Sequence, residues 1–190
     1  MIIIGVDEAG RGPLVGSVVS AAVAFPLGVN IDGLTDSKKL SEKKREELYL
    51  QITHQCYWAS AESNSIEIDK INILQATMAS MRRAVLNLQN QLISLTGVQD
   101  FKVLVDGNRC PEVENCEAII KGDLIEPLIS AASIIAKVTR DRQMKELDQI
   151  YPEYGFSRHK GYGTKDHLEA LEKFGPIVGQ HRFTFAPIKA

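Results

Sequence analysis

Short runs of apolar and β-branched residues mark the strands of this chain. Residues 2–6 form a continuous β-branched run that predicts a buried strand, and residues 18–25 form a second run of small and β-forming residues. Three more runs predict strands at residues 56–61, 101–105 and 118–120. The chain is therefore expected to contain a sheet.

A different period marks the helices. Between Asn72 and Ser94, apolar side chains recur at steps of four and three, which places them on one face of a long helix. These side chains belong to Leu74, Met78, Met81, Val85, Leu88 and Leu92. Capping and helix-breaking residues predict three further helices, over residues 42–55, 127–150 and 164–175.

The order of these elements indicates the fold class. Strands lead the chain and then alternate with helices, which favours an α/β fold in which helices cover a mixed sheet. No linker divides the chain, so residues 1–190 are expected to form a single domain. Residues from about 151 to 190 are expected to form a small helical part packed on the sheet.

Composition excludes two broad classes of protein. With 44% hydrophobic and 24% charged residues, the chain of 190 residues is not generally disordered. Its longest apolar runs are far too short to cross a bilayer, and its first residues lack the basic segment of a signal peptide. Three cysteines are too few for a disulfide scaffold. We therefore expect a cytoplasmic protein without a membrane partner.

The net charge of −2 hides an uneven distribution along the chain. Residues 156–165 contain three basic side chains and no acid, whereas residues 100–123 contain six acids against three bases. Charge separated in this way can become two distinct surfaces after folding. A nucleic-acid partner is thus compatible with an overall negative charge.

Four acidic residues stand where predicted strands end. Asp7 and Glu8 follow the first strand, Asp106 follows the strand over 101–105, and Asp123 lies just beyond another. Ligands of open α/β sheets gather at the carboxyl ends of strands, so these carboxylates are candidates for one site. Strand neighbours face opposite sides, and Glu8 is therefore expected to have left the regular strand. The alternative is that each acid caps a turn or aids solubility.

A cluster of carboxylates requires a cation, because like charges raise one another's pKa values. Mg²⁺ and Mn²⁺ are the expected ions, since both prefer oxygen ligands. The sequence Gly10-Arg11-Gly12 lacks the residues of a phosphate-binding loop or a dinucleotide fingerprint. It still permits close approach of the backbone to a ligand, and a plain tight turn is the alternative.

Two further segments could contact a nucleic acid. Ser37 and Lys38 precede a predicted helix and offer hydroxyl, ammonium and backbone donors for a phosphate, although a solvated helix start is the usual explanation. Lys160 and Tyr162 lie among glycines, where a cation and an aromatic ring can neutralise a phosphate and stack on a sugar or base. A core position is the alternative for Tyr162.

Taken together, these motifs resemble the ribonuclease HII family. The matching segments are VDEAGRGPLVG (6–16), TDSKKLS (35–41), VLVDGN (103–108), IIKGD (119–123), AASIIAKVTRDR (131–142), HKGYGTKDH (159–167) and HRFTFAPI (181–188). They follow the family's order and span nearly the whole chain. The resemblance implies a ribonuclease H-like mixed sheet flanked by helices, with a small C-terminal helical part.

The resemblance also implies an activity. The family cleaves the RNA strand of RNA–DNA hybrids and cuts at single ribonucleotides embedded in duplex DNA. With two Mg²⁺ or Mn²⁺ ions, cleavage on the 5′ side of the ribonucleotide is expected to leave 3′-hydroxyl and 5′-phosphate ends. We expect a monomer whose partners are these nucleic acids.

Residue roles carry over by motif. The four metal-binding and catalytic acids correspond to Asp7, Glu8, Asp106 and Asp123. The turn that senses the ribose 2′-hydroxyl corresponds to Gly10, Arg11 and Gly12, and Tyr162 corresponds to the tyrosine that packs against the sugar. The expected phosphate contacts are Ser37, Lys38, Lys160 and Lys165.

Some positions depart from the family's pattern, and two other functions compete with this one. Ser17 and Ser20 replace the usual Pro and Ala, and residues 124–126 add an acid close to Asp123. The nearer alternative is another metal nuclease of the same fold, such as a junction resolvase. The other is a catalytically silent nucleic-acid-binding module.

Overall fold

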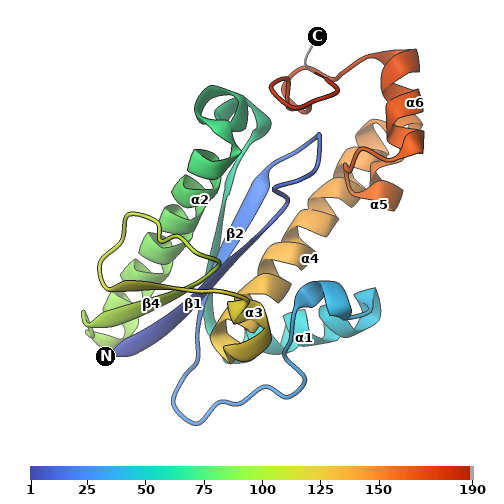
Figure 1. The fold of residues 1–190 in the computed structure, drawn as a ribbon. Coiled ribbons are helices and arrows are strands. Elements are labelled where there is room, and N and C mark those ends of the chain that lie inside the picture. The colour runs from blue at the N-terminus through green and yellow to red at the C-terminus, as the bar shows by residue number, and fades with distance from the viewer. Residues whose placement is uncertain (189–190) are drawn as a thin grey trace.

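The computed structural model describes residues 1–188, and its centre is a five-stranded mixed sheet (Figure 1). Its strands are β1 (Ile2–Ala9), β2 (Val18–Ala24), β3 (Tyr57–Ser63), β4 (Phe101–Asp106) and β5 (Cys116–Ile119). Across the sheet the order is β3-β2-β1-β4-β5. The β1–β2 and β2–β3 pairs are antiparallel, whereas β4 pairs in parallel with both β1 and β5. The prediction of an α/β fold with a mixed sheet is confirmed.

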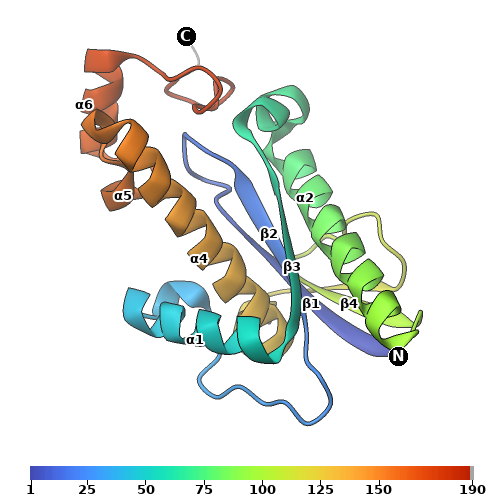
Figure 2. The ribbon, with the colours of Figure 1, turned by 180° about the vertical axis from the view of Figure 1, so that it is seen from behind.

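One face of the sheet is covered by α2 (Ser65–Thr96), the long helix seen on one side of the sheet in both ribbon views (Figures 1 and 2). Met81 and Leu88 of its apolar stripe are buried against Ile4 and Val6 of β1, as the helical period predicts. The helix begins earlier than predicted because it is kinked. Asn72 has a φ of 68°, and its side chain caps the second segment.

The opposite face is covered by α1 (Glu42–Gln55) and α4 (Pro127–Ile150), which lie together on the other side of the sheet from α2 in Figure 2. Leu48 and Ile52 of α1 join the apolar cluster between α4 and the sheet. The β1 strand approaches α4 very closely at Gly5, where a Cβ atom would lie 2.3 Å from the carbonyl carbon of Leu128. A side chain at this position would push the helix away from the sheet.

The C-terminal part lies beyond one end of the sheet (Figure 1). It contains the 3₁₀ turn η2 (Pro152–Tyr154), α5 (Phe156–His159) and α6 (Lys165–Phe174). Its apolar residues Tyr154 and Phe156 pack on Met144 of α4 and on Val15 of the β1–β2 connection. The helical content is as expected, but the part packs on α4 and this connection rather than on a face of the sheet.

Two short helices complete the framework of residues 1–188. They are the 3₁₀ turn η1 (Ser37–Lys39), before α1, and α3 (Gly122–Ile125), between β5 and α4. No helix within residues 1–188 combines the length and the apolar character needed to cross a membrane.

Candidate active site

Parallel pairing of β1 and β4 brings two of the acids together. Val6 is the register partner of Val105, so Asp7 and Asp106 come next to each other at the carboxyl ends of the two strands. The backbone N–H of Asp123, in the first turn of α3, donates to Oδ1 of Asp106 at 3.4 Å. Three acids that are far apart in the sequence therefore meet at one edge of the sheet.

Glu8 reaches this edge in a way that the sequence analysis did not predict. The expectation that it has left the regular strand is wrong, because β1 continues to Ala9 and Glu8 pairs with Ser20. The neighbouring strand β4 ends at Asp106, so it no longer flanks β1 at Glu8. The side chain of Glu8 lines two cavities at this edge, one bounded by residues of α4 and the other by residues of α2.

Burial and mutual repulsion dominate the electrostatics of these acids. Burial raises the pKa of Asp7 well above its ordinary value, and the charges of Glu8 and Asp106 raise it further. Burial also raises the pKa of Glu8, whereas Arg11, 3.4 Å away, opposes this effect. The pKa of Asp123 is raised by burial and then by Asp106. A cation near these carboxylates would favour their ionised forms.

The donor set fits a hard divalent cation, because all four side chains offer carboxylate oxygens. Within residues 1–188, however, no three Asp, Glu, His or Cys side chains are close enough to hold an ion by themselves. Mg²⁺ in proteins commonly takes one or two carboxylates and completes its shell with water and substrate phosphate oxygens. The geometry thus suits metal ions that are coordinated partly by these carboxylates and partly by the oxygens of a bound phosphate.

The glycine turn and Tyr162 face each other beside the acids. Gly10 has a φ of 95°, and a Cβ atom there would lie 2.1 Å from Nε of Arg140, so only glycine suits this position. A Cβ atom on Gly12 would lie 3.3 Å from Cε1 of Tyr162. Tyr162 is 46% exposed, so the interpretation of an accessible aromatic is confirmed over the core alternative.

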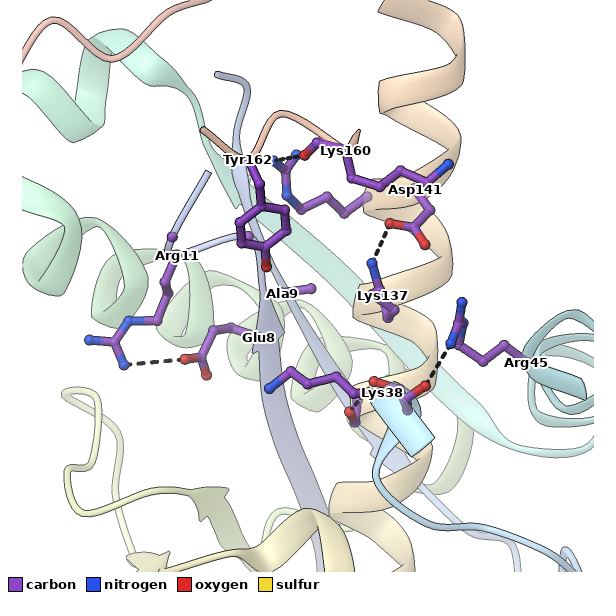
Figure 3. Close-up of a pocket in the computed structure, with 14 residues that line it drawn as sticks. Glu8, Ala9, Arg11, Lys38, Arg45, Lys137, Asp141, Lys160 and Tyr162 are labelled. Carbon is purple, nitrogen blue, oxygen red and sulfur yellow. Dashed lines mark hydrogen bonds and ion pairs between the residues drawn. The ribbon is translucent and has the colours of Figure 1, made fainter. Parts of the chain in front are cut away.

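A cavity of about 450 Å³ connects the turn, Tyr162 and a set of basic side chains (Figure 3). The basic residues on its wall are Arg11, Lys38, Arg45, Lys137, Arg140 and Lys160. In Figure 3, Glu8 and Lys38 extend into the space below the ring of Tyr162. Of the four candidate acids, Glu8 alone lines this cavity, where it faces cations and an aromatic ring that suit a phosphate and a sugar or base.

Several residues of this wall were missed by the sequence analysis. Lys137, Arg140 and Asp141 come from α4, where Nζ of Lys137 donates to Oδ1 of Asp141 at 2.6 Å. Their spacing of three and four places them on one face of the predicted helix, and this pattern could have revealed them. Arg45 also lines the cavity, but its guanidinium is held by two backbone carbonyls of the segment before α1.

The predicted contacts are not all equivalent. Ser37 lines the cavity, but its side chain is buried and its Oγ lies 2.8 Å from Oγ of Ser133. Lys38 and Lys160 lie on the wall. Lys165 is not among the lining residues, and at the start of α6 it pairs with Glu169 at 3.6 Å.

Comparison with known proteins gives a consistent result. The family model of ribonuclease HII matches residues 4–187. Ribonuclease HII of Acinetobacter baylyi is 55% identical over 191 residues, covering 99% of this chain and 96% of that protein. Among solved structures, ribonuclease H2 of Pyrococcus horikoshii superposes with a TM-score of 0.74 at 28% identity, covering 99% of this chain and 95% of that chain.

A more distant structure shows the same fold. Bst-RNase HIII, solved in complex with Mn²⁺, gives a TM-score of 0.75 at 17% identity. The match covers 100% of this chain and 68% of that chain. The ribonuclease H-like fold implied by the sequence motifs is therefore confirmed.

Proposed function

Because this chain belongs to the ribonuclease HII family and has its ribonuclease H activity (EC 3.1.26.4), we propose that it cuts at ribonucleotides in RNA–DNA hybrids and in duplex DNA. The adjacency of Asp7 and Asp106 beside the Gly10–Gly12 turn carries this proposal. Family membership favours this ribonuclease activity over the two alternatives, a junction resolvase and a catalytically silent binding module.

The activity depends on divalent metal ions, which we assign to Asp7, Glu8, Asp106 and Asp123. Their repulsion and their oxygen donors support this assignment. The chemistry supplied by two bound Mg²⁺ or Mn²⁺ ions is activation of a water molecule and stabilisation of the leaving 3′ oxygen. Cleavage on the 5′ side of the ribonucleotide then leaves 3′-hydroxyl and 5′-phosphate ends.

The basic wall of the cavity orients the nucleic acid. Lys38 and Lys160 neutralise backbone phosphates. The hydroxyl of Ser37 bonds with that of Ser133 and so holds the 3₁₀ turn that carries Lys38. Lys165 extends this contact outside the cavity. Binding through phosphates makes the affinity fall as the salt concentration rises.

The turn and the tyrosine recognise the ribonucleotide. Backbone polar groups of Gly10, Arg11 and Gly12 pair with the 2′-hydroxyl, and Tyr162 packs against the sugar. When the hydroxyl is absent, these groups lose their partner after being removed from water, which disfavours pure DNA. The turn therefore restricts cleavage to sites that contain ribose.

We place the active protein in the cytoplasm as a monomer. This chain by itself supplies the candidate metal ligands, the glycine turn and the basic wall of the cavity, which supports a site that needs no second copy.

The test uses four nucleic acids and maps the cut. The substrates are an RNA–DNA hybrid, a DNA duplex with one ribonucleotide, the same duplex without the 2′-hydroxyl, and a branched DNA. We expect Mg²⁺- or Mn²⁺-dependent cleavage of the first two alone, prevented by EDTA, with 3′-hydroxyl and 5′-phosphate ends. Equal cleavage of the ribonucleotide duplex and its deoxy analogue, or cleavage of the branched DNA alone, would overturn the proposal.

A further inference from the structure

The Arg182 side chain is fully buried, and its guanidinium makes four hydrogen bonds to the loop formed by residues 10–16, which includes the glycine turn. Its Nε donates to the carbonyl of Gly16 at 2.9 Å, and its Nη2 donates to that of Gly10 at 2.6 Å. Its Nη1 donates to the carbonyls of Arg11 at 2.9 Å and Pro13 at 2.8 Å. An arginine has five N–H groups, so four of them can serve carbonyls of one loop.

These bonds determine where the loop's amide groups point. In a planar trans peptide, the carbonyl of one residue and the N–H of the next point in opposite directions. The carbonyls of Gly10 and Arg11 are turned inward to Arg182, so the N–H groups of Arg11 and Gly12 must point outward. No hydrogen bond found within residues 1–188 uses either N–H, and both residues line the cavity.

Arg182 is itself held in place by contacts of its backbone, its side chain and the residues that follow it. The backbone N–H of Arg182 donates to the carbonyl of Leu14 at 2.8 Å, and the ring of Phe185 lies 5.1 Å from its Cζ. The following N–H groups, of Phe183 and Thr184, donate to the carboxylate of Asp69 at 2.8 and 2.9 Å. The C-terminal segment is thus tied to α2, and Arg182 is a rigid support.

We propose that Arg182 is the positioning residue for ribose recognition: by holding the carbonyls of Gly10 and Arg11 inward, it presents the N–H groups of Arg11 and Gly12 to an oxygen of the ribonucleotide. The inference rests on the proposed function and deepens it. Arg182 does not touch the substrate, because it is fully buried behind the turn. Lysine cannot replace it, because an ammonium group has three N–H donors on one nitrogen. It cannot bond to four carbonyls that are arranged around a planar guanidinium.

Binding without cleavage tests this role most directly. The Asp106→Asn protein is compared with the Asp106→Asn/Arg182→Lys protein on two DNA duplexes, one of them carrying a single ribonucleotide. We expect the first protein to prefer the ribonucleotide duplex by about tenfold, as one or two hydrogen bonds would supply. Adding Arg182→Lys should bring the ratio of the two Kd values close to one, with the Kd for pure DNA within about twofold of its original value.

Cleavage gives a second readout in the otherwise unchanged protein. Arg182→Lys should lower kcat on the ribonucleotide duplex by about 100-fold, because a small misplacement of recognition groups has effects of this size. The matched control is Arg83→Lys, whose guanidinium also serves a backbone carbonyl, that of Glu62, but which does not line the cavity. Arg83→Lys should change neither the ratio nor kcat.

The possible results distinguish a failure of the proposed ribose recognition from a failure of the role assigned to Arg182. A ratio of Kd values does not depend on the folded fraction, so a general loss of stability leaves it unchanged. If the Asp106→Asn protein binds both duplexes equally, the proposed ribose recognition falls, and this inference falls with it. If it prefers the ribonucleotide and Arg182→Lys keeps that preference, only the role of Arg182 is overturned. Failure of both Arg182→Lys and Arg182→Gln to fold would make Arg182 a folding residue and also overturn the inference.

Discussion

Asp7 and Asp106 occupy adjacent positions on two parallel strands, one residue beyond the paired Val6 and Val105. Burial, the charge of Glu8 and the charge of Asp106 together raise the pKa of Asp7. Such an arrangement opposes folding when no cation is present, since charged groups are removed from water and repel one another. The acids at this edge are thus better explained by binding than by stability.

Replacing Asp106 by Asn should therefore have opposite effects on activity and on stability. Cleavage of a duplex with one ribonucleotide should fall by at least about 10³-fold, because a ligand of the metal site is lost. The metal-free variant should be more stable than the metal-free wild type, because repulsion with Asp7 and Glu8 is relieved. We expect its free energy of unfolding to rise by up to about 1 kcal/mol and its melting temperature to rise accordingly. Steady-state kinetics and thermal melts in EDTA measure the two effects.

The matched control is Asp100→Asn, one residue before β4 at its other end. Asp100 is exposed, and its carboxylate pairs with the N-terminal ammonium of Met1 at 3.6 Å. We expect near-normal cleavage and little change in stability for this variant. Normal turnover of Asp106→Asn would remove that residue from the metal site.

The two lysines Lys38 and Lys165 should differ in their effects on binding. Lys38 lines the cavity, whereas Lys165 is largely exposed and pairs with Glu169. Lys38→Ala should weaken duplex binding several-fold at low salt and reduce the slope of log K against log salt by about 0.9, one phosphate contact. Lys165→Ala should change both quantities less. Affinity titrations at a series of salt concentrations measure them, and equal effects would show that the cavity does not set the phosphate contacts.

Tyr162 should act through its ring rather than through its hydroxyl. The ring is partly exposed and lies beside Gly12, where a Cβ atom would come within 3.3 Å of Cε1. Tyr162→Phe should keep nearly normal kcat/KM, whereas Tyr162→Ala should lose about 10- to 100-fold, as expected for one stacking contact. An alanine variant with normal kinetics would leave Tyr162 a purely structural role.

Patterns that repeat locally were sufficient to predict much of this fold. The stripe that contains Met81 and Leu88 lies on the sheet as its helical period requires, because burial of one helix face depends on spacing alone. The start of α2 was missed, because Asn72 adopts a positive φ that joins two helical segments and no hydrophobic period reports such a kink. Glu8 was placed wrongly, because the sequence does not reveal where the neighbouring strand ends.

The candidate site depends more on contacts between distant residues. The convergence of Asp7 with Asp106 follows from the parallel register of β1 and β4, which strand order alone did not determine. Arg182 bonds to carbonyls more than 165 positions earlier in the chain, and no local pattern reports that relationship. Only the cations of α4, with their helical spacing, were open to prediction.

His181 is buried next to Arg182 and forms an isolated β-bridge with Val15 of the same loop. Burial and, to a smaller extent, His167, whose Nε2 lies 3.2 Å from that of His181, lower the pKa of His181 to about 4. In the unfolded chain the imidazole titrates near 6.5. Between these two values the unfolded state binds the extra proton, so the contribution of His181 to stability is present above about pH 6.5 and is lost as the pH falls toward 4.

Urea unfolding at pH 7 and pH 5 measures this contribution. We expect His181 to account for about 1–2 kcal/mol of the stability lost between the two pH values. His181→Asn is the suitable variant, because the amide oxygen of Asn can replace Nδ1 as the acceptor for the N–H of Ile177. Buried carboxylates such as Asp7, with raised pKa values, change stability in the opposite direction and are common to both proteins. The difference between wild type and variant therefore isolates the histidine, and equal losses in both would show that His181 is not the titrating group.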